Sequence, residues 1–173
     1  WSKRTGMNGG INGFLTSYAF NIMVVYYYLR RGQMQFVPLD SSDVSKVPMV
    51  PTGMEILRPD AEAVGRSALD FFDFYRHEFQ WERDVISLSR PEVTTREQLQ
   101  WTPAVEDQLK MELGEHGDRV AYRLCIEDPY EVNLNVGRVA TAFKADLFRR
   151  NMQIAQETAF GWIKEESFEE DLY

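Results

Sequence analysis

Cysteine is nearly absent from this chain, and basic residues are outnumbered by acidic ones. The lone cysteine, Cys125, excludes an internal disulfide and makes a structural zinc site unfavourable, because such sites draw on several Cys and His ligands. The chain has 19 Lys and Arg and 27 Asp and Glu residues, which gives a formal net charge of −8. Autonomous nucleic-acid binders neutralise phosphates with clustered Lys and Arg. Any RNA contact should therefore come from a local basic patch or from sequence outside this segment.

Long apolar runs are also missing. The most apolar stretch, 14–29, contains Thr16, Ser17 and Asn21, and it is shorter than the ~20 apolar residues that a membrane span needs. We interpret it as a buried core helix and expect no membrane contact. A length of 173 residues and a hydrophobic content of 44% predict one domain with one core. Because the chain begins at Trp1 rather than Met, we expect it to be a segment of a longer protein.

The sequence patterns predict a mostly α fold with a small β element, an α+β class. Arg30, Arg31 and Gly32 supply the cationic last turn and glycine stop of a first helix, and Asp60 can cap a second. The second helix should pack through an apolar stripe of Val64, Ala68, Leu69, Phe72 and Tyr75. We predict helices at 15–31, 60–79, 104–113 and 136–165, strands at 85–88 and 120–126, a loop at 33–60 and an acidic tail at 168–173.

The segment that opens the first helix offers a hydroxyl beside an aromatic ring. Ser17 lies where backbone N–H groups of the first turn are unpaired, so its hydroxyl and those amides can receive a phosphate oxygen. Tyr18 can stack its ring on a nucleobase. The alternatives are that Ser17 is an ordinary N-terminal cap and that Tyr18 is one more core aromatic.

A second segment, 125–138, places two carboxylates beside a proline turn. Asp128 and Glu131 are acceptors when ionised, and uracil carries an N3–H donor that cytosine lacks. Carboxylates reaching that edge, directly or through water, would favour UTP over CTP. The alternative is that Asp128 only forms a turn and that Glu131 is solvated or paired with Arg138.

Three residues that follow are expected to support this acidic loop. They are Asn135, Gly137 and Arg138. The glycine permits a tight entry into the next helix, and the arginine is placed to stabilise the loop from behind.

In this order the two segments resemble motifs of the terminal uridylyltransferases and noncanonical poly(A) polymerases, namely Gly-x-Leu-x-Ser-Tyr and Ile-Glu-Asp-Pro-Phe/Tyr-Glu…Asn-Val-Gly-Arg. A third segment, 67–79 followed by 84–87, is similar to the poly(A)-polymerase-associated region of that family, which would occupy about 60–138 here. The likeness is greatest to kinetoplastid mitochondrial RNA-editing uridylyltransferases. Asp70, Asp73, His77 and Glu78 fall in this third segment and are not interpreted as a metal site. Asp70 and Asp73 are expected to be solvated or capping residues.

The resemblance implies that residues 1–173 form the helical, base-recognising second domain of a bilobal nucleotidyltransferase. Such an enzyme adds UMP to an RNA 3′ end when the RNA hydroxyl attacks the α-phosphate of UTP and pyrophosphate leaves. Two Mg²⁺ ions would be held by three acidic residues of a separate, upstream catalytic domain that this chain does not contain, so no catalytic or metal-ligating residue is assigned here. Lys3, in a Trp-x-Lys context, would contact the triphosphate, although a plain surface lysine is the alternative.

The resemblance also implies UTP and an RNA 3′ end as ligands, an RNA-processing complex as a partner and a mitochondrial location. One departure from the family concerns base selection. Leu134 stands where several uridylyltransferases have a histidine that helps them prefer UTP to ATP. A noncanonical poly(A) polymerase that uses ATP therefore stays open, as do a catalytically inactive scaffold and a helical interaction domain with accidental motif matches.

Overall fold

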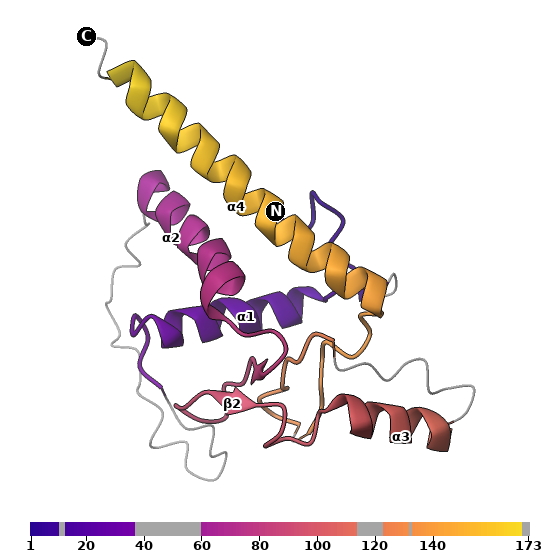
Figure 1. Cartoon of the computed structure of the whole chain (residues 1–173). Helices are drawn as coiled ribbons and strands as arrows, with labels where there is room; N and C mark the ends of the chain where they lie inside the picture. Colours follow the sequence, from indigo (N-terminus) through magenta and orange to yellow (C-terminus); the bar gives the residue numbers. More distant parts are fainter. Residues whose placement is uncertain (11–12, 37–59, 114–122, 132, 171–173) are drawn as a thin grey trace.

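The computed structural model describes residues 1–10, 13–36, 60–113, 123–131 and 133–170 (Figure 1). Its helices are α1 (Ser17–Arg30), α2 (Ala61–Asp73), the π-helix η3 (Phe74–Glu78), α3 (Pro103–Leu113) and α4 (Ala142–Glu170). Strands β1 (Asp84–Val85) and β2 (Thr94–Thr95) pair antiparallel, with Asp84 opposite Thr95. The predicted α+β class is confirmed. In Figure 1, α2 lies beside the long α4, α1 lies below both, and α3 lies apart from them.

Helix α1 is central to the core, as the sequence predicts. Its N-cap is Thr16, whose hydroxyl accepts a hydrogen bond from the Ala19 amide at 3.2 Å. Gly32 follows the helix with a φ of +66°, a left-handed conformation that favours glycine and ends the helix. Between these ends α1 buries one face, whose residues are Ala19, Ile22, Met23, Tyr26 and Tyr27.

The predicted second helix is present, but its last turn is wider than an α-turn. Asp60 caps it and accepts from the Ala63 amide at 2.6 Å, as expected. At the other end the Phe79 amide donates to the Phe74 carbonyl at 3.0 Å, the i→i+5 bond of a π-helix.

The predicted stripe on this helix is partly wrong. Val64 and Ala68 are exposed, and α2 itself buries no residue. Burial begins only in and after the π-turn, at Phe74, Tyr75 and Phe79. Val64 and Ala68 precede the π-turn and line an open apolar groove, so they face other apolar side chains without being covered by them.

The core is built largely from aromatic rings. Tyr75 is 1% exposed, and its hydroxyl donates to the Met23 carbonyl of α1 at 2.8 Å. Trp81 packs edge-on against Phe148 of α4, with ring centroids 6.0 Å apart. A smaller cluster of Val85, Trp101 and Cys125 lies apart from this core.

The remaining predictions are confirmed only in part. Helix α3 fits the predicted 104–113. The strand predicted at 85–88 is shorter, because Ile86 forms an isolated parallel bridge with Ile126 instead. Helix α4 begins at 142 rather than 136 and continues to 170, so 168–170 belong to the helix and not to a tail. Most of the loop predicted at 33–60, and residues 120–122 of the second strand, lie outside the described residues.

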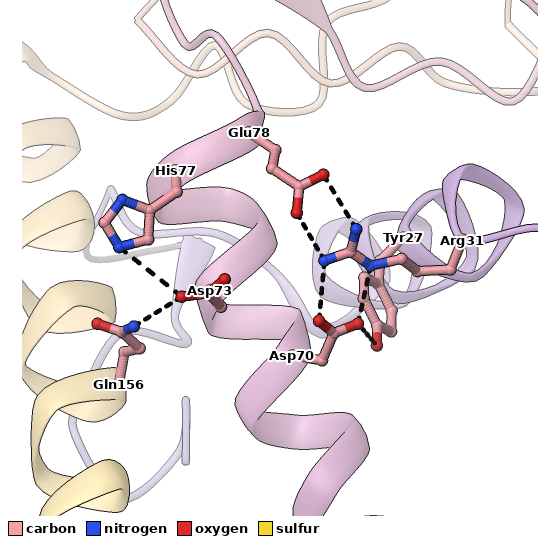
Figure 2. A network of polar contacts seen from close by, with 7 residues as sticks. All are labelled: Tyr27, Arg31, Asp70, Asp73, His77, Glu78 and Gln156. Atoms are coloured by element: carbon pink, nitrogen blue, oxygen red, sulfur yellow. Dashed lines mark hydrogen bonds and ion pairs between the residues drawn. The ribbon is translucent and has the colours of Figure 1, made fainter.

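Polar contacts join α1 to α2 and η3 through one arginine (Figure 2). Arg31 donates to both oxygens of Asp70 at 2.8 Å and to Glu78 at 3.0 Å. The Tyr27 hydroxyl also donates to Asp70, at 2.6 Å. Burial raises the pKa of Asp70, but hydrogen bonds from Tyr27 and Arg31 outweigh it, and the net shift is downward.

Asp73 links α2 to α4. It accepts a hydrogen bond from the Gln156 amide at 2.8 Å and lies 3.7 Å from the His77 imidazole (Figure 2). In the part of the chain that the structure describes, no three His, Cys, Asp or Glu side chains are grouped as metal ligands, and no helix is long and apolar enough to cross a membrane. Asp70 and Asp73 therefore bond to side chains from α1 and α4, and the prediction that they are only solvated or capping residues is wrong.

Candidate functional site

The N-terminal turn of the chain is tied to the start of α1. The Asn8 side-chain amide donates to Ser17 Oγ at 2.9 Å and to Ser2 Oγ at 3.5 Å. Ser17 is exposed and occupies the first helical position, whereas Thr16 is the cap. The alternative interpretation of Ser17 as an ordinary cap is therefore wrong. The Ser17 hydroxyl lies beside the unpaired amides of the first turn, where an anion can be bound.

Lys3 lies in the same N-terminal turn, next to Ser2. It is exposed, and its side chain makes no hydrogen bond or ion pair with the described residues. Its carbonyl accepts from the Gly6 amide at 3.4 Å, which closes the turn. The structure thus brings Lys3 into the neighbourhood of Ser17 through the hydrogen bonds of Asn8.

A second cation reaches the start of α1 from α4. Lys144 Nζ lies 5.0 Å from the centre of the Phe14 ring, within cation–π range. It also lies 2.9 Å from the place where a Cβ on Gly13 would be, and Gly13 has a φ of +71°. Nothing in the sequence pattern indicates that a lysine so late in the chain lies here.

Tyr18 and Asp128 meet although they are far apart in the sequence. Tyr18 is 40% exposed, so it is not a core aromatic. Partial burial raises the pKa of Tyr18, and the negative charge of Asp128 and a side-chain hydrogen bond with it raise that pKa further. The structure therefore places the aromatic ring of the first segment beside the acidic loop of the second.

The acidic loop is a tight turn around Asp128. Its carboxylate accepts from the amides of Tyr130 at 2.8 Å and Glu131 at 3.0 Å. The Asp128 amide donates to the Leu134 carbonyl at 2.9 Å, and Asn133 has a φ of +65°. Asp128 is thus a turn former, as one interpretation holds, and it also contacts Tyr18.

Glu131 and Tyr130 project outward from this turn. Tyr130 is 79% exposed, and the Glu131 side chain is exposed without an ion pair among the described residues. The loop therefore presents a free carboxylate and a free ring to solvent, next to Tyr18.

The neighbouring Glu127 is buried, in contrast to the exposed Glu131, and it is not among the predicted site residues. It is 4% exposed and accepts hydrogen bonds from the hydroxyls of Ser87 at 2.5 Å and Ser89 at 3.1 Å. Its amide donates to the Ile86 carbonyl at 2.9 Å. The three preceding residues, 124–126, are buried as well, so alternation along the segment does not single out Glu127.

Asn135 and Gly137 hold the loop from behind. The buried Asn135 amide oxygen accepts from the Ile126 amide at 3.0 Å and from the Gly137 amide at 2.9 Å. A Cβ at Gly137 would lie 2.0 Å from the Leu124 carbonyl oxygen, so the approach requires glycine. Arg138 is exposed, and in the described residues its guanidinium forms no ion pair with Glu131. Only its amide contacts the loop, through the Asn135 carbonyl at 3.3 Å.

The chain is similar to Cid1-family poly A polymerases and to terminal uridylyltransferases. The family model described as Cid1 family poly A polymerase matches residues 64–134. Terminal uridylyltransferase 4 of Trypanosoma brucei brucei is 48% identical over 92% of this chain and 47% of its own length. Terminal uridylyltransferase 1 of the same organism is 40% identical over 80% of this chain and 16% of its own length.

Solved structures of a relative have the same fold. Trypanosoma brucei terminal uridylyl transferase 4 with bound UTP superposes with a TM-score of 0.77 at 48% identity, over 92% of this chain and 51% of that one. The same enzyme with bound ATP also gives a TM-score of 0.77, over 92% of this chain and 49% of that one. The chain therefore spans about half or less of these relatives.

Proposed function

This chain belongs to the family of terminal uridylyltransferases and noncanonical poly(A) polymerases, and we propose that it binds and identifies UTP in an enzyme that adds UMP to RNA 3′ ends. The observation that carries the proposal is the contact of Tyr18 with Asp128. A ring for stacking and an acidic loop for the base edge lie together there, although separate segments supply them.

The base would be held by stacking and identified by charge. Stacking on Tyr18 contributes about 1–3 kcal/mol and tolerates any base. Glu131, exposed and unpaired among the described residues, and Asp128 would accept from the N3–H of uracil directly or through water. Cytosine has no such hydrogen, so this loop favours UTP over CTP.

The phosphates would lie at the start of α1. The Ser17 hydroxyl and the free amides of the first turn are suitable donors for an anion. Lys3 and Lys144 supply positive charge near this end of the helix. In this arrangement the base points to the acidic loop and the triphosphate to the helix terminus.

The described residues do not fit a magnesium site of the kind that the family resemblance implies. No group of three acidic or histidine side chains is present among them. Asp128 already accepts from two backbone amides and Tyr18, which leaves about one of its roughly four acceptor sites for a single further hydrogen bond. The carboxylates for the transfer step, together with Mg²⁺, would therefore come from another part of the protein, and this chain would orient the nucleotide.

A poly(A) polymerase that uses ATP is the second candidate function. It is favoured by Leu134, which stands where several uridylyltransferases have a histidine that helps them prefer UTP to ATP. A scaffold role, a mitochondrial location and membership of an RNA-processing complex stay predictions from the resemblance.

The test is binding of UTP, CTP and ATP, with Mg²⁺, to the full-length protein and to an Asp128→Ala, Glu131→Ala double variant. Preference for UTP that collapses in this variant supports the proposal. A Glu62→Ala, Glu112→Ala variant is the control, because it removes the same charge from exposed sites elsewhere and should keep the preference. Equal binding of ATP and UTP by the wild type favours the poly(A) polymerase, and absence of nucleotide binding favours the scaffold.

A further inference from the structure

We propose that a pocket between η3 and α4, here called the arginine pocket, binds phosphate groups of single-stranded RNA. The pocket has a volume of about 430 Å³. Its lining residues are Tyr75, Arg76, Trp81, Arg149, Arg150, Met152 and Gln153. The proposal rests on the proposed function in one respect, namely that RNA is the substrate.

The inner wall of the arginine pocket is apolar and rigid. Tyr75 and Met152 are 1% and 3% exposed. The Trp81 indole N–H donates to the Tyr75 carbonyl at 2.7 Å, which fixes the ring, and the Arg149 guanidinium lies 5.4 Å from the centre of that ring. A guanidinium held over an aromatic ring keeps its orientation, so less freedom is lost when it binds a ligand.

The rim carries more positive than negative charge. Arg76 pairs with Glu157 at 3.1 Å, and Arg149 pairs with Glu82 at 2.7 Å. Both carboxylates are well exposed, and such surface pairs contribute only about 0–1 kcal/mol, so a phosphate can replace either one. Arg150 is exposed, and its side chain makes no hydrogen bond or ion pair with the described residues.

Phosphate is the ligand that this chemistry favours. Guanidinium groups bind phosphate oxygens through paired hydrogen bonds, and a nearby aromatic wall suits a nucleotide. On a chain with a net charge of −8, a site with three arginines and two rim carboxylates is a local exception. It is a local basic patch, which is one of the two sources of RNA contact expected from the sequence.

The arginine pocket also touches the segment that carries the acidic loop. Arg149 Nη2 donates to the Arg123 carbonyl at 3.0 Å. From Arg123 the chain reaches Asp128 within five residues, which extend to at most about 18 Å. The hydrogen bond of Arg149 therefore connects the arginine pocket to the segment that leads to the acidic loop.

The test is fluorescence anisotropy of a labelled single-stranded RNA with the full-length protein over a range of salt concentrations. Arg150→Ala should weaken RNA binding by about tenfold, the order expected for one charged hydrogen bond, and lower the slope of log K against log salt by about 1. Arg150→Glu should weaken binding further. UTP affinity and the urea midpoint should stay at wild-type values. Arg66→Glu is the control, since this exposed arginine pairs with Glu62 on α2, away from the arginine pocket, and should leave RNA binding unchanged.

RNA binding that Arg150→Glu leaves at the wild-type level would overturn the proposal. The proposal would also be overturned if Arg150→Glu weakened binding of an acidic peptide and left binding of RNA unchanged, because the ligand of the pocket would then be a protein. Failure of the proposed function gives a different result. If the full-length protein binds no nucleotide but Arg150→Glu weakens its binding of RNA, the proposed RNA site stands and the proposed UTP-binding function is wrong.

Discussion

The side-chain amide of Asn8 donates a hydrogen bond to the Ser17 hydroxyl oxygen at 2.9 Å. A hydroxyl has one hydrogen and two acceptor sites. Because Asn8 occupies an acceptor site of Ser17, the hydroxyl hydrogen is free to be donated to another group. At the start of α1, that group would be a phosphate oxygen.

Replacing Asn8 should therefore weaken binding of UTP and act through Ser17. We expect Asn8→Ala to raise the Kd for UTP about fivefold, which corresponds to about 1 kcal/mol for one hydrogen bond. In a Ser17→Ala background the same substitution should have almost no effect, which a double-mutant cycle measures. Asn8→Asp should weaken binding more, since a carboxylate accepts the Ser17 hydrogen and repels phosphate.

Additive effects of Asn8→Ala and Ser17→Ala would contradict this role of Asn8. The control is Asn151→Ala, which removes a side-chain amide that donates to the Leu147 carbonyl on α4.

Tyr18 should contribute to UTP binding through its ring more than through its hydroxyl. Loss of stacking in Tyr18→Ala should cost about 1–3 kcal/mol, at least about fivefold in Kd. Tyr18→Phe keeps the ring and loses only the hydrogen bond with Asp128, so its Kd should rise less than fivefold. Calorimetry with UTP measures both. Tyr130 is the second exposed ring on the same surface, and a larger loss in Tyr130→Ala than in Tyr18→Ala would move the stacking role there.

Gly137→Ala should destabilise the protein strongly. The added Cβ would lie 2.0 Å from the Leu124 carbonyl oxygen, so the backbone of the acidic loop must move. We expect a loss of at least about 2 kcal/mol in the free energy of unfolding, measured in urea. Gly65→Ala is the matched control. Among the described residues, no atom beyond the local backbone of α2 lies within 4 Å of its added Cβ. Alanine also favours a helix interior, so the variant should be as stable as the wild type or up to about 1 kcal/mol more stable.

Asp70 should stabilise the fold in a pH-dependent way. Its pKa in the folded protein is lowered, so its contribution is present above the unfolded value of about 3.9 and is lost as the pH falls through the folded pKa. Asp70→Asn should therefore be less stable than the wild type at pH 7, and the difference should shrink in strong acid. Urea unfolding at several pH values measures this. An equal difference at every pH would show that the carboxylate charge is not the cause, and Asp107→Asn on the exposed face of α3 should show no difference at pH 7.

Local signals in the sequence predict much of this fold. The helix that ends at Gly32 and the helix capped by Asp60 are where capping chemistry places them, because both signals act within one turn. The π-turn at 74–78 has no such local signal. The exposure of Val64 and Ala68 depends on how closely the helices around their groove pack, which helical spacing does not encode. The start of α4 is also missed, because Asn135 and Gly137 keep the chain in turns until residue 141.

The candidate site is predictable where it follows motifs and not where it depends on packing. Ser17, Tyr18, Asp128 and Glu131 are singled out from sequence, and the contact of Tyr18 with Asp128 brings their segments together. Asn8, Lys144 and the arginine pocket depend on contacts between distant segments, which spacing alone does not encode. Glu127 shows the same limit, since its burial depends on two serines of another segment.

The π-turn η3 determines which residues after position 73 lie on the same face of the helix as residues of α2. Asp70 precedes this turn and Glu78 ends it, yet both reach the guanidinium of Arg31. A π-turn accommodates one residue more than an α-turn. On a regular α-helix, residues eight positions apart lie about 80° apart around the axis, whereas residues seven positions apart lie only about 20° apart. By absorbing one residue, η3 therefore puts Asp70 and Glu78 on nearly the same face of the helix. A chain with one residue deleted within 74–78 would form a regular α-helix that keeps both carboxylates on that face, so this helix can lose one residue and retain its contact with Arg31.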